Sequence, residues 1–564
     1  MTAVTPLVTE APTDDLDQAV HDLAAGAETW ARLSVADRAG LIAATHASIA
    51  TAAEEWAAAA ILAKGTPRGS LEGEEWMSGP YAALAGFGAI AETLAKLASG
   101  KSPLDGITAG QAPGGRTSFR MLPSTLQEFN LFNGFTADLW LQPGISAERA
   151  RATAGLGARH VRENGGVGLV LGAGNISAIG PLDVLYELVA YNRASVLKVN
   201  PTFAGLTAAY TKAFAPLIEA NLLRIVNGGA QTGGYLTRHP GIGHVHITGS
   251  GVTHDAIVWG AGDKSGKPVL DKPITSELGG VSPIIVVPGE WSKADLRYQA
   301  EHVATQRLHN GGHNCIAGQA LILSSDWAQR EAFLTILRDV LDSLPTRDPW
   351  YPGTDRKLAA ATASYPHAEQ RAGRYLIAVD ESTSQDLLTT EYFGPVLGHT
   401  SLPGTGIEFL RAAIDFANDR LDGTLGASLI VAPADRKAIG PAFDDAIADL
   451  RYGTIGINVW SAIGFLVPAL SWGAYPGNTL EQVGSGIGIV HNAHLVDHVE
   501  RSVVNGPFRP FPRSVLAGEL ALSPKPGWFV TARSAKATAE QLTAYAARPG
   551  WLKLPAIFAA AFRA

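Results

Sequence analysis

The sequence predicts an α/β protein built on parallel β-sheets, with more than one domain and with large buried areas. From residue 167 on, short apolar runs alternate with helical patterns, which is typical of strands buried in a parallel sheet. The length of 564 residues is enough for two or three domains with cores of their own. Charged residues make up 17% of the chain, below the usual value of about 25%, which indicates large buried areas or contacts between subunits.

The N-terminal part of the chain is expected to be helical. Residues 15–30 carry apolar side chains at helical spacing, and Ser34 is typical of the residue that caps a following helix. A third, alanine-rich helix is expected over residues 54–63, and Gly65 ends it. Trp56 is expected in the core.

The middle of the chain has the strand and helix order of a dinucleotide-binding domain of the Rossmann type. Helices are expected near residues 182–191 and 206–219. The glycine fingerprint GxGxxG is missing, because residues 171–175 read LGAGN. The expected strands are residues 167–171, 195–199, 223–227, 244–248 and 269–270.

Cys315 is the single cysteine of the chain and lies in the stretch NGGHNCIAGQ at residues 310–319. A reactive thiol needs a polar niche in which backbone N–H groups meet the negative charge of the thiolate. Gly311 and Gly312 allow close backbone approach, and small residues after the cysteine leave room for a substrate. A buried cysteine that acts as a small hydrophobe is the alternative, and the polar flank argues against it.

Six separated motifs occur in an order that resembles the aldehyde dehydrogenase superfamily. The resemblance extends from about residue 15 to about residue 477 and implies the fold and the chemistry of that superfamily. The motifs are GN at Gly174 and Asn175, VLKVNP with Lys198, TGS at Thr248 to Ser250, SELGG with Glu277, NCIAGQ with Cys315, and EYFGPV with Glu391.

The resemblance implies a catalytic role for three residues. Cys315 corresponds to the nucleophile that attacks an aldehyde carbonyl to give a thiohemiacetal and then a thioester. The side-chain amide of Asn175 and the backbone N–H of Cys315 correspond to the donors that stabilise the oxyanion. Glu277 corresponds to the general base, and its apolar flank is suited to raising the pKa of a carboxylate.

The resemblance also implies NAD or NADP as the cofactor. Lys198 and Glu391 correspond to residues that bind ribose hydroxyls, and Phe393 to a residue that packs beside the nicotinamide. Gly249 and Ser250 are expected against the pyrophosphate at the start of a helix, where N–H groups and the helix dipole favour anions.

Pro201 bears on the choice between the two cofactors. Many NAD-preferring relatives have a glutamate three residues after the lysine, which repels a 2′-phosphate. Because Pro201 carries no charge, we expect that NADP is tolerated and is a candidate for the preferred cofactor.

Four positions depart from the usual pattern of the superfamily. His313 stands where Gln or Glu is usual, Ala320 where Arg is common, Val281 where Lys or Asn is usual, and Gly174 where a tryptophan or a similar residue is common. These differences indicate a divergent branch. His313 is also a candidate to activate the thiolate of Cys315.

The predicted architecture has three parts. Residues 14–142 and 166–279 form the Rossmann-like dinucleotide-binding domain, and residues 280–455 form the catalytic α/β domain. Residues 143–165 and part of 456–564 form a small oligomerisation element and a C-terminal extension. A homodimer or homotetramer is expected, as in many relatives.

The predicted function is NAD(P)-dependent oxidation of an aldehyde to its carboxylic acid. A CoA-acylating relative and a catalytically silent binding or structural protein with the same fold are the alternatives. An apolar, long or aromatic aldehyde is expected, since apolar residues occur in the region that lines the substrate mouth in relatives. They are Trp460, Phe465, Leu466, Trp472 and Tyr475.

The C-terminal segment 549–564 places Trp551, Leu554, Phe558 and Phe562 in a helix-like apolar stripe. We expect the stripe to pack on the surface of its own subunit or of a partner. A gate over a substrate tunnel and a contact with a membrane surface are the alternatives.

Composition argues against several other functions. The net charge of −8 and the pI near 6.0 give no basic surface for nucleic acid, and we assign no metal ligands. No apolar run reaches the roughly 18 residues of a membrane helix. With one cysteine and no apolar leader in residues 1–17, the predicted location is the cytoplasm.

Overall fold

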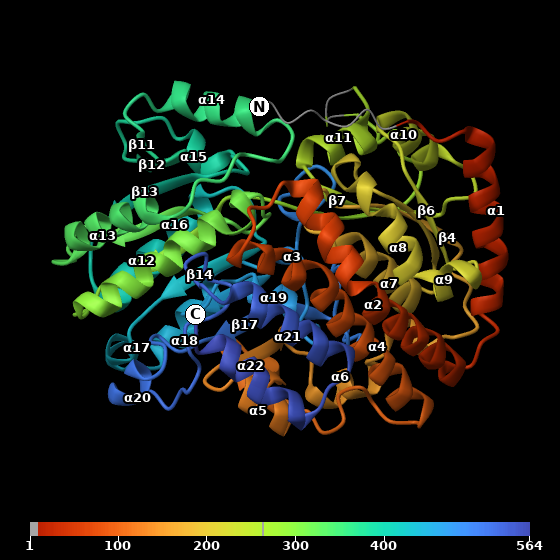
Figure 1. Cartoon of the computed structure of the whole chain (residues 1–564), viewed down its shortest axis with the longest axis horizontal. Coiled ribbons are helices and arrows are strands. Elements are labelled where there is room, and N and C mark those ends of the chain that lie inside the picture. Colours follow the sequence, from red (N-terminus) through yellow and green to blue (C-terminus); the bar gives the residue numbers. More distant parts are fainter. Residues whose placement is uncertain (1–8, 262–263, 265) are drawn as a thin grey trace.

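The computed structural model describes residues 9–261, 264 and 266–564, and its helices and strands are arranged around two β-sheets. In Figure 1 the smaller sheet, with β4, β6 and β7, lies on the right, and the larger sheet, with β13 and β14, lies on the left. The fold is mixed α/β, as the sequence predicts.

The smaller sheet has the strand order β16-β8-β7-β4-β5-β6. Its five main strands are parallel, and the short β16 pairs antiparallel with β8 at one edge. All carboxyl ends of the parallel strands therefore meet at one edge of the sheet, where open α/β sheets bind their ligands. The strands are β4 (Val167–Leu171), β5 (Ala194–Lys198), β6 (Leu223–Val226), β7 (His244–Gly249), β8 (Ile274–Leu278) and β16 (Gly486–Ile487).

The larger sheet joins segments that are far apart in the sequence. Its order is β1-β2-β3-β17-β15-β14-β9-β10-β13-β12-β11, and β3 pairs antiparallel with β17. The strands are β1 (Ala109–Ala112), β2 (Arg116–Leu122), β3 (Thr136–Leu141), β9 (Ser282–Val286), β10 (Gly318–Ser324), β11 (Glu369–Arg371), β12 (Arg374–Ala378), β13 (Val396–Leu402), β14 (Gly426–Ile430), β15 (Thr454–Ile457) and β17 (Val499–Asn505).

Strand β9 shows how the larger sheet is covered on both faces. Ile284 and Val286 pack among residues of α12 (Lys293–Leu308) and α13 (Arg330–Ser343). Ile285 packs on the opposite side, among residues of α16 (Gly406–Arg420) and α18 (Ala442–Asp449). Because side chains alternate between the faces of a strand, a continuous apolar run is required here.

The N-terminal helices cover the smaller sheet. Helix α1 (Thr13–Trp30) and helix α2 (Val35–Lys64) contain Trp30 and Trp56, which are 1% and 0% exposed. The side chain of Ser34 accepts a hydrogen bond from the N–H of Asp37, which confirms the predicted cap. The separate third helix at residues 54–63 is wrong, because α2 has no glycine or proline in that stretch and continues to Gly65.

Two further predictions are corrected in the dinucleotide-binding part. Residues 269–270 form no strand, since the N–H groups of Val269 and Leu270 donate to the carbonyl oxygen of Val258 at 2.8 and 3.3 Å and not to a neighbouring strand, and β8 begins only at Ile274. The predicted helix over residues 206–219 is interrupted at Phe214, one position before the helix that carries Pro216.

The other helices connect these strands or lie on the surface. They are α3 (Gly73–Trp76), α4 (Ala82–Ala98), α5 (Leu126–Leu131), α6 (Ala147–Thr153), α7 (Ile179–Tyr191), α8 (Thr207–Ala213), α9 (Ala215–Glu219), α10 (Ala230–Arg238), α11 (Gly251–Trp259), α14 (Thr354–Ser364), α15 (Asp386–Thr389), α17 (Pro433–Ile439), α19 (Ile463–Leu466), α20 (Arg513–Leu516), α21 (Ala535–Ala547) and α22 (Leu554–Ala561).

The predicted domain boundaries stay a prediction. Strands β1 to β3 lie in the sequence segment 14–142, and the structure places them in the larger sheet with β17. The segment 143–165 contains α6 and a short 3-10 turn that contacts α7.

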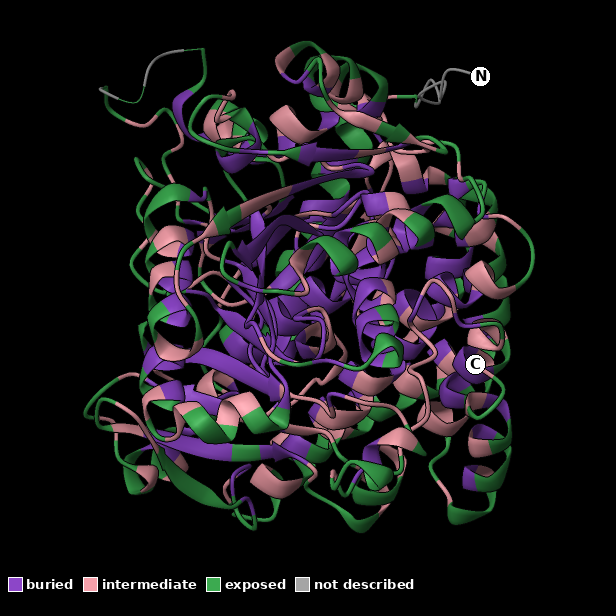
Figure 2. Ribbon diagram, turned by 90° about the vertical axis from the view of Figure 1, so that its left-hand side faces the viewer, coloured by how far each residue is buried: buried purple, intermediate pink, exposed green. Residues whose placement is uncertain are grey.

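Figure 2 shows buried residues concentrated in the sheets at the centre and exposed residues on the peripheral helices and loops. Among the described residues, no helix is both long enough and apolar enough to cross a membrane.

Candidate active site

Cys315 lies in a tight loop between α12 and β10. Asn310, Gly311 and Gly312 have successive positive φ angles of 56°, 69° and 83°. A Cβ atom on Gly312 would lie 2.6 Å from the carbonyl oxygen of Gly394, so glycine is required there. The loop presents the half-buried Cys315 at one end of a pocket.

Arg307 holds the two sides of this loop. Its guanidinium donates to the carbonyl oxygens of Gly312 at 2.8 Å and of Ala317 at 3.3 Å. The residue is 2% exposed, and burial lowers its pKa to about 10. An arginine remains protonated at neutral pH even so, and it can fix both carbonyls at once.

Glu277 lies near the carboxyl end of β8 and is 1% exposed. Burial raises its pKa to about 7. Its carboxyl and the Cys315 thiol are close enough to shift the pKa of each other. Burial, and then the charge of Glu277, raise the thiol pKa well above its ordinary value. A carboxylate with a raised pKa beside a thiol can take the proton of that thiol.

Asn175 follows β4 and reaches the cysteine loop. Its Nδ2 donates to the carbonyl oxygen of His313 at 3.0 Å, and Asn310 donates to the same oxygen at 3.0 Å. Within the part of the chain that the structure describes, the N–H of Cys315 donates to no oxygen, and it lowers the pKa of its own thiol. Both predicted oxyanion donors therefore lie beside the pocket, with the N–H of Cys315 free of an oxygen acceptor.

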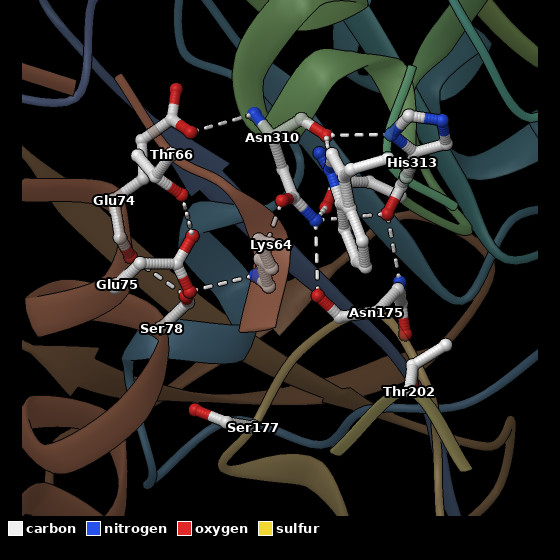
Figure 3. A network of polar contacts seen from close by, with 12 residues as sticks. Lys64, Thr66, Glu74, Glu75, Ser78, Asn175, Ser177, Thr202, Asn310 and His313 are labelled. Carbon is white, nitrogen blue, oxygen red and sulfur yellow. Dashed lines mark hydrogen bonds and ion pairs between the residues drawn. The ribbon is translucent and has the colours of Figure 1, made fainter. Parts of the chain in front are cut away.

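A buried network of charges supports Asn310 from behind (Figure 3). Nζ of Lys64 lies 2.8 Å from Glu75 and donates to Oδ1 of Asn310 at 3.1 Å, and the side chains of Lys64 and Glu75 are both 0% exposed. The N–H of Asn310 donates to Glu74 at 3.1 Å, and Arg347 pairs with Glu74 at 2.6 Å. Two cations thus balance two carboxylates inside the protein, as buried charges require.

The pocket in front of Cys315 is a hollow of about 620 Å³ with mostly apolar walls. The predicted residues Trp460, Phe465, Leu466 and Trp472 line it. Tyr475 does not line this pocket, because its ring lies 4.9 Å from the guanidinium carbon of Arg501 elsewhere. The remaining lining residues are Met77, Ser78, Asn175, Ile176, Ile179, His309, Asn314, Ile316, Ala462, Ile463 and Trp528.

Three predicted cofactor residues lie at the carboxyl edge of the smaller sheet. Lys198 ends β5, and burial lowers its pKa. Gly249 ends β7, and the side chain of Ser250 caps α11 by accepting from the N–H of Thr253 at 3.3 Å. Gly249 and Ser250 are both exposed, so the start of α11 is open to an anion.

Glu391 and Phe393 reach the same region from the larger sheet. Gln319 fixes their loop by donating to the carbonyl of Thr390 at 2.8 Å and by accepting from the N–H of Tyr392 at 3.0 Å. Burial raises the pKa of Glu391 to about 7, and Oε1 of Glu391 has no hydrogen-bond partner among the described residues. A buried acceptor without a donor fits a ribose hydroxyl, so these residues are suited to a dinucleotide.

Comparison with known proteins finds a family match over the middle of the chain. The model of the aldehyde dehydrogenase family matches residues 145–358, which include Asn175, Lys198, Glu277 and Cys315. This part of the chain is similar to the aldehyde dehydrogenase family. The chain is similar to betaine aldehyde dehydrogenase of Amaranthus hypochondriacus, with 29% identity over 39% of this chain and 45% of the relative. It is also similar to 4-trimethylaminobutyraldehyde dehydrogenase A of Danio rerio, with 27% identity over 45% of this chain and 47% of the relative.

The chain spans less than half the length of the curated relatives that it matches. Solved structures match over a much larger share of the chain. Aldehyde dehydrogenase C of Pseudomonas syringae, solved as a mutant with NAD+ and octanal, has a TM-score of 0.59, 19% identity and coverage of 89% and 90%. An NAD-dependent aldehyde dehydrogenase of Sinorhizobium meliloti has a TM-score of 0.58, 21% identity and coverage of 89% of each chain. At this identity, the likeness shows the aldehyde dehydrogenase fold.

One departure from the superfamily pattern now has a structural explanation. A Cβ atom on Gly174 would lie 2.7 Å from the side chain of Asn200, so a large residue before Asn175 would collide with it. Asn200 in turn caps the turn that begins at Pro201, since its Oδ1 accepts from the N–H of Thr202 at 3.2 Å.

The hypothesis that His313 activates Cys315 is wrong. Nδ1 of His313 lies 3.0 Å from the carbonyl oxygen of Asn310, and Nε2 lies 3.0 Å from Oγ1 of Thr354. Burial lowers its pKa to about 3, so the ring is neutral and both nitrogens have other partners. The imidazole packs beside Tyr351 and Phe393 instead.

Sequence reasoning missed several residues that hold this candidate site. Arg307 lies next to the cysteine motif, and its position one helical turn before the glycine turn was an available signal. Lys64, Glu75 and Trp528 are separated from Cys315 by more than 200 residues and carry no local signal of their role.

Proposed function

We propose that this chain oxidises an apolar aldehyde to its carboxylic acid with NAD or NADP as the hydride acceptor. The observation that carries the proposal is the single thiol, Cys315, at the end of an apolar pocket beside a carboxyl whose pKa is raised to about 7. The match of residues 145–358 to the aldehyde dehydrogenase family and the likeness to a fold that binds NAD+ and octanal in a relative support the same chemistry.

The first step is attack on the aldehyde. Glu277 accepts the proton of the Cys315 thiol, and the thiolate forms a bond to the carbonyl carbon. The carbonyl oxygen becomes an oxyanion, to which the N–H of Cys315 and the amide of Asn175 donate hydrogen bonds. A neutral amide is suited to this task because it adds no positive charge that would hold back the thiolate.

A bound dinucleotide would supply the hydride acceptor that the oxidation of the thiohemiacetal on Cys315 to a thioester requires. Lys198 and Glu391 would bind its ribose hydroxyls, and the start of α11 at Ser250 would bind the pyrophosphate. Phe393, with a φ of 47°, would pack beside the nicotinamide.

Hydrolysis then releases the acid. Glu277 first releases the proton that it took from Cys315 to the solvent, and then takes a proton from a water molecule, whose oxygen attacks the thioester carbon. The carbon–sulfur bond breaks, and the sulfur leaves as a thiolate that is reprotonated. Because the pKa of the Glu277 carboxyl is about 7, Glu277 can act as a base in both steps at neutral pH.

The test is NAD(P)H formation with a panel of aliphatic and aromatic aldehydes, with and without CoA, for the wild type beside Cys315→Ala. Turnover without CoA that is lost in the variant is the expected result. Turnover only with CoA would assign the chain to the acylating branch. No turnover with any aldehyde would contradict the proposal and favour the silent binding protein.

Glu277 decides between water and CoA in the proposal. A base next to the thioester is needed to deprotonate water, whereas acylating relatives often lack this glutamate. Its burial beside Cys315 therefore favours the hydrolytic reaction.

A further inference from the structure

The last part of the chain, residues 506–564, is called here the C-terminal extension. It begins directly after β17 and contains α20, α21 and α22. In Figure 1 its blue helix α21 lies beside the N-terminal helices α3 and α4, and α22 packs against α21. Lys536 at the start of α21 pairs with Glu72 at 2.7 Å, next to the residues of the buried charge network.

The C-terminal extension covers one face of α12, the helix that leads into the Cys315 loop. Arg509 forms two hydrogen bonds of 3.0 Å with Asp295, and Gln299 donates to the carbonyl of Phe508 at 2.7 Å. The N–H of Val530 donates to Thr305 at 3.1 Å. These contacts recur along one face of the helix, as the spacing of three to four residues requires.

This face of α12 is polar and yet buried. Asp295, Gln299, His302 and Thr305 are all at most 3% exposed. The ring of Phe529 stacks on His302 at 5.4 Å, and burial lowers the pKa of His302 to about 3. A polar helix face needs partners for its groups when it is removed from water, and the C-terminal extension supplies them. The extension is therefore part of the body of the enzyme.

Trp528 extends from this segment into the wall of the active-site pocket. Its ring lies 6.3 Å from that of Trp460 and 5.6 Å from that of His302. It packs with Ile316, the neighbour of Cys315, in one apolar cluster. The wall that faces the reactive thiol thus combines residues from earlier parts of the chain with one residue of the extension.

We propose that Trp528 is a specificity-determining residue that limits the length of the substrate chain, and that the substrate is a neutral, apolar aldehyde. This inference rests on the proposed function of the same site. An aldehyde whose carbonyl carbon reaches Cys315 has its tail among the apolar walls of the pocket, where the indole of Trp528 occupies part of the space.

The charges around the pocket support a neutral substrate. Among the residues that the structure describes, no Asp, Glu, Lys or Arg side chain lines it. Its one imidazole, that of His309, is buried, and burial lowers its pKa, so it offers no cation to a carboxylate tail. Glu277, the carboxyl nearest to Cys315, has a pKa of about 7 and is needed as the base. A charged tail would lose its hydration without gaining a partner of opposite charge.

The experiment uses the single cysteine as a reporter, with the full-length chain. The rate of alkylation of Cys315 by 2-iodo-N-alkylacetamides with alkyl tails from methyl to decyl is followed by intact-protein mass spectrometry. Trp528→Ala and Trp528→Phe are compared with the wild type. Trp551→Ala is the matched control, because Trp551 lies in the same extension, is 54% exposed and does not line the pocket.

In the wild type, the rate is expected to fall beyond a certain tail length. In Trp528→Ala this limit moves to longer tails, with a gain of about fourfold for each methylene that newly enters the pocket. Trp528→Phe gives a smaller shift, and it keeps the test valid if the alanine variant does not fold. An unchanged length limit in both variants, or an equal change in Trp551→Ala, would overturn the role of Trp528.

Two further arms separate this inference from the proposed function. An N-neohexyl reagent is compared with its trimethylammonium isostere, and faster labelling by the cation in the wild type would overturn the neutral substrate. Aldehyde turnover is measured with the same tails. If the length limit for labelling shifts but no aldehyde is turned over, Trp528 still forms the wall and the proposed dehydrogenase activity is refuted. If aldehydes are turned over but the length limit does not shift, the proposed activity stands and the role of Trp528 is refuted.

Discussion

The indole Nε1 of Trp472 donates a hydrogen bond of 3.3 Å to Oε1 of Glu277. Trp472 is itself a wall residue of the pocket in front of Cys315. The side chain that shapes the space for the substrate therefore also holds the carboxyl that serves as the proposed base. Burial raises the pKa of this carboxyl to about 7, and the hydrogen bond from Trp472 opposes that increase.

The first prediction concerns the pH dependence of the reaction. Glu277 acts as a base only when it is deprotonated, so kcat/KM falls as the pH decreases through about 7. Trp472→Phe removes a donor that favours the charged form, so the pKa of Glu277 rises. The acidic limb of the pH profile is expected to move upward by about 1 unit, because a hydrogen bond to a charged group contributes about 1.5 kcal/mol.

Trp460→Phe is the control for this measurement. Nε1 of Trp460 donates to the carbonyl oxygen of Ile316 at 3.1 Å and not to a carboxyl group. The same loss of an indole from the same pocket should therefore leave the midpoint of the acidic limb where it is. A shift of equal size in both variants would show that the pocket as a whole, and not the Trp472 hydrogen bond, sets this pKa.

The second prediction concerns stability. Lys64→Met leaves Glu75 without its partner in a place where both side chains are 0% exposed. The free energy of unfolding is expected to fall by about 3 to 5 kcal/mol, because an uncompensated charge remains buried. Urea denaturation followed by circular dichroism measures this loss.

The double variant Lys64→Met with Glu75→Gln removes both charges and keeps the size of the glutamate. Part of the lost stability should return, since the remaining Glu74 and Arg347 form a pair of their own at 2.6 Å. If the double variant lost more free energy of unfolding than the two single variants lose together, the pairing of Lys64 with Glu75 would be contradicted.

The third prediction separates two roles of Asn310. Its amide donates to the carbonyl oxygens of Asn175 at 3.1 Å and of His313 at 3.0 Å, and its φ is 56°. Asn310→Gly removes the amide but accepts this backbone conformation, whereas Asn310→Ala also adds strain of about 1 kcal/mol. Both variants should lose turnover to a similar extent, and only the alanine variant should lose the additional stability.

Comparing kcat and the thermal midpoint of both variants checks this. If Asn310→Gly kept full turnover, the side-chain amide would not be needed to position Asn175 and the Cys315 loop.

The parallel strands of the smaller sheet could be predicted because each is a short apolar run between turn residues. The error at residues 269–270 has a physical cause: the N–H groups of Val269 and Leu270 donate to the carbonyl oxygen of Val258 and not to a neighbouring strand, and apolarity alone does not report this. Similarly, the alanine-rich end of α2 gave no signal for a break because it contains no residue that breaks a helix.

Motifs placed Cys315, Glu277 and Asn175 on the chain, but the means by which they are held could not be read locally. The partners of Asn310 lie on α2 and α3, more than 200 residues earlier in the sequence. Trp528 follows the last motif by more than 100 residues. Contacts between residues so far apart in the sequence depend on the packing of whole elements. The apolar stripe of residues 549–564 is an example, because Leu554 is 6% exposed whereas Trp551 and Phe562 are 54% and 50% exposed.

The last prediction concerns the choice of cofactor. The absence of a charge at Pro201 favours tolerance of NADP, but Glu10 introduces a charge from elsewhere in the chain. Its carboxylate accepts hydrogen bonds from the N–H groups of Gly229 and Thr232, at 2.9 Å each, at the start of α10. Burial lowers the pKa of Lys198, and the charge of Glu10 is near enough to oppose part of that decrease.

If Lys198 binds the adenine ribose, the charge of Glu10 opposes a 2′-phosphate in the same place. NADH should then bind more tightly than NADPH, and Glu10→Gln should increase the affinity for NADPH about fivefold, which corresponds to the loss of about 1 kcal/mol of repulsion, while changing that for NADH little. Quenching of tryptophan fluorescence by each reduced dinucleotide, without aldehyde, measures both dissociation constants. A wild type that already binds NADPH as tightly as NADH would refute the role of Glu10 and leave the uncharged Pro201 as the feature that matters.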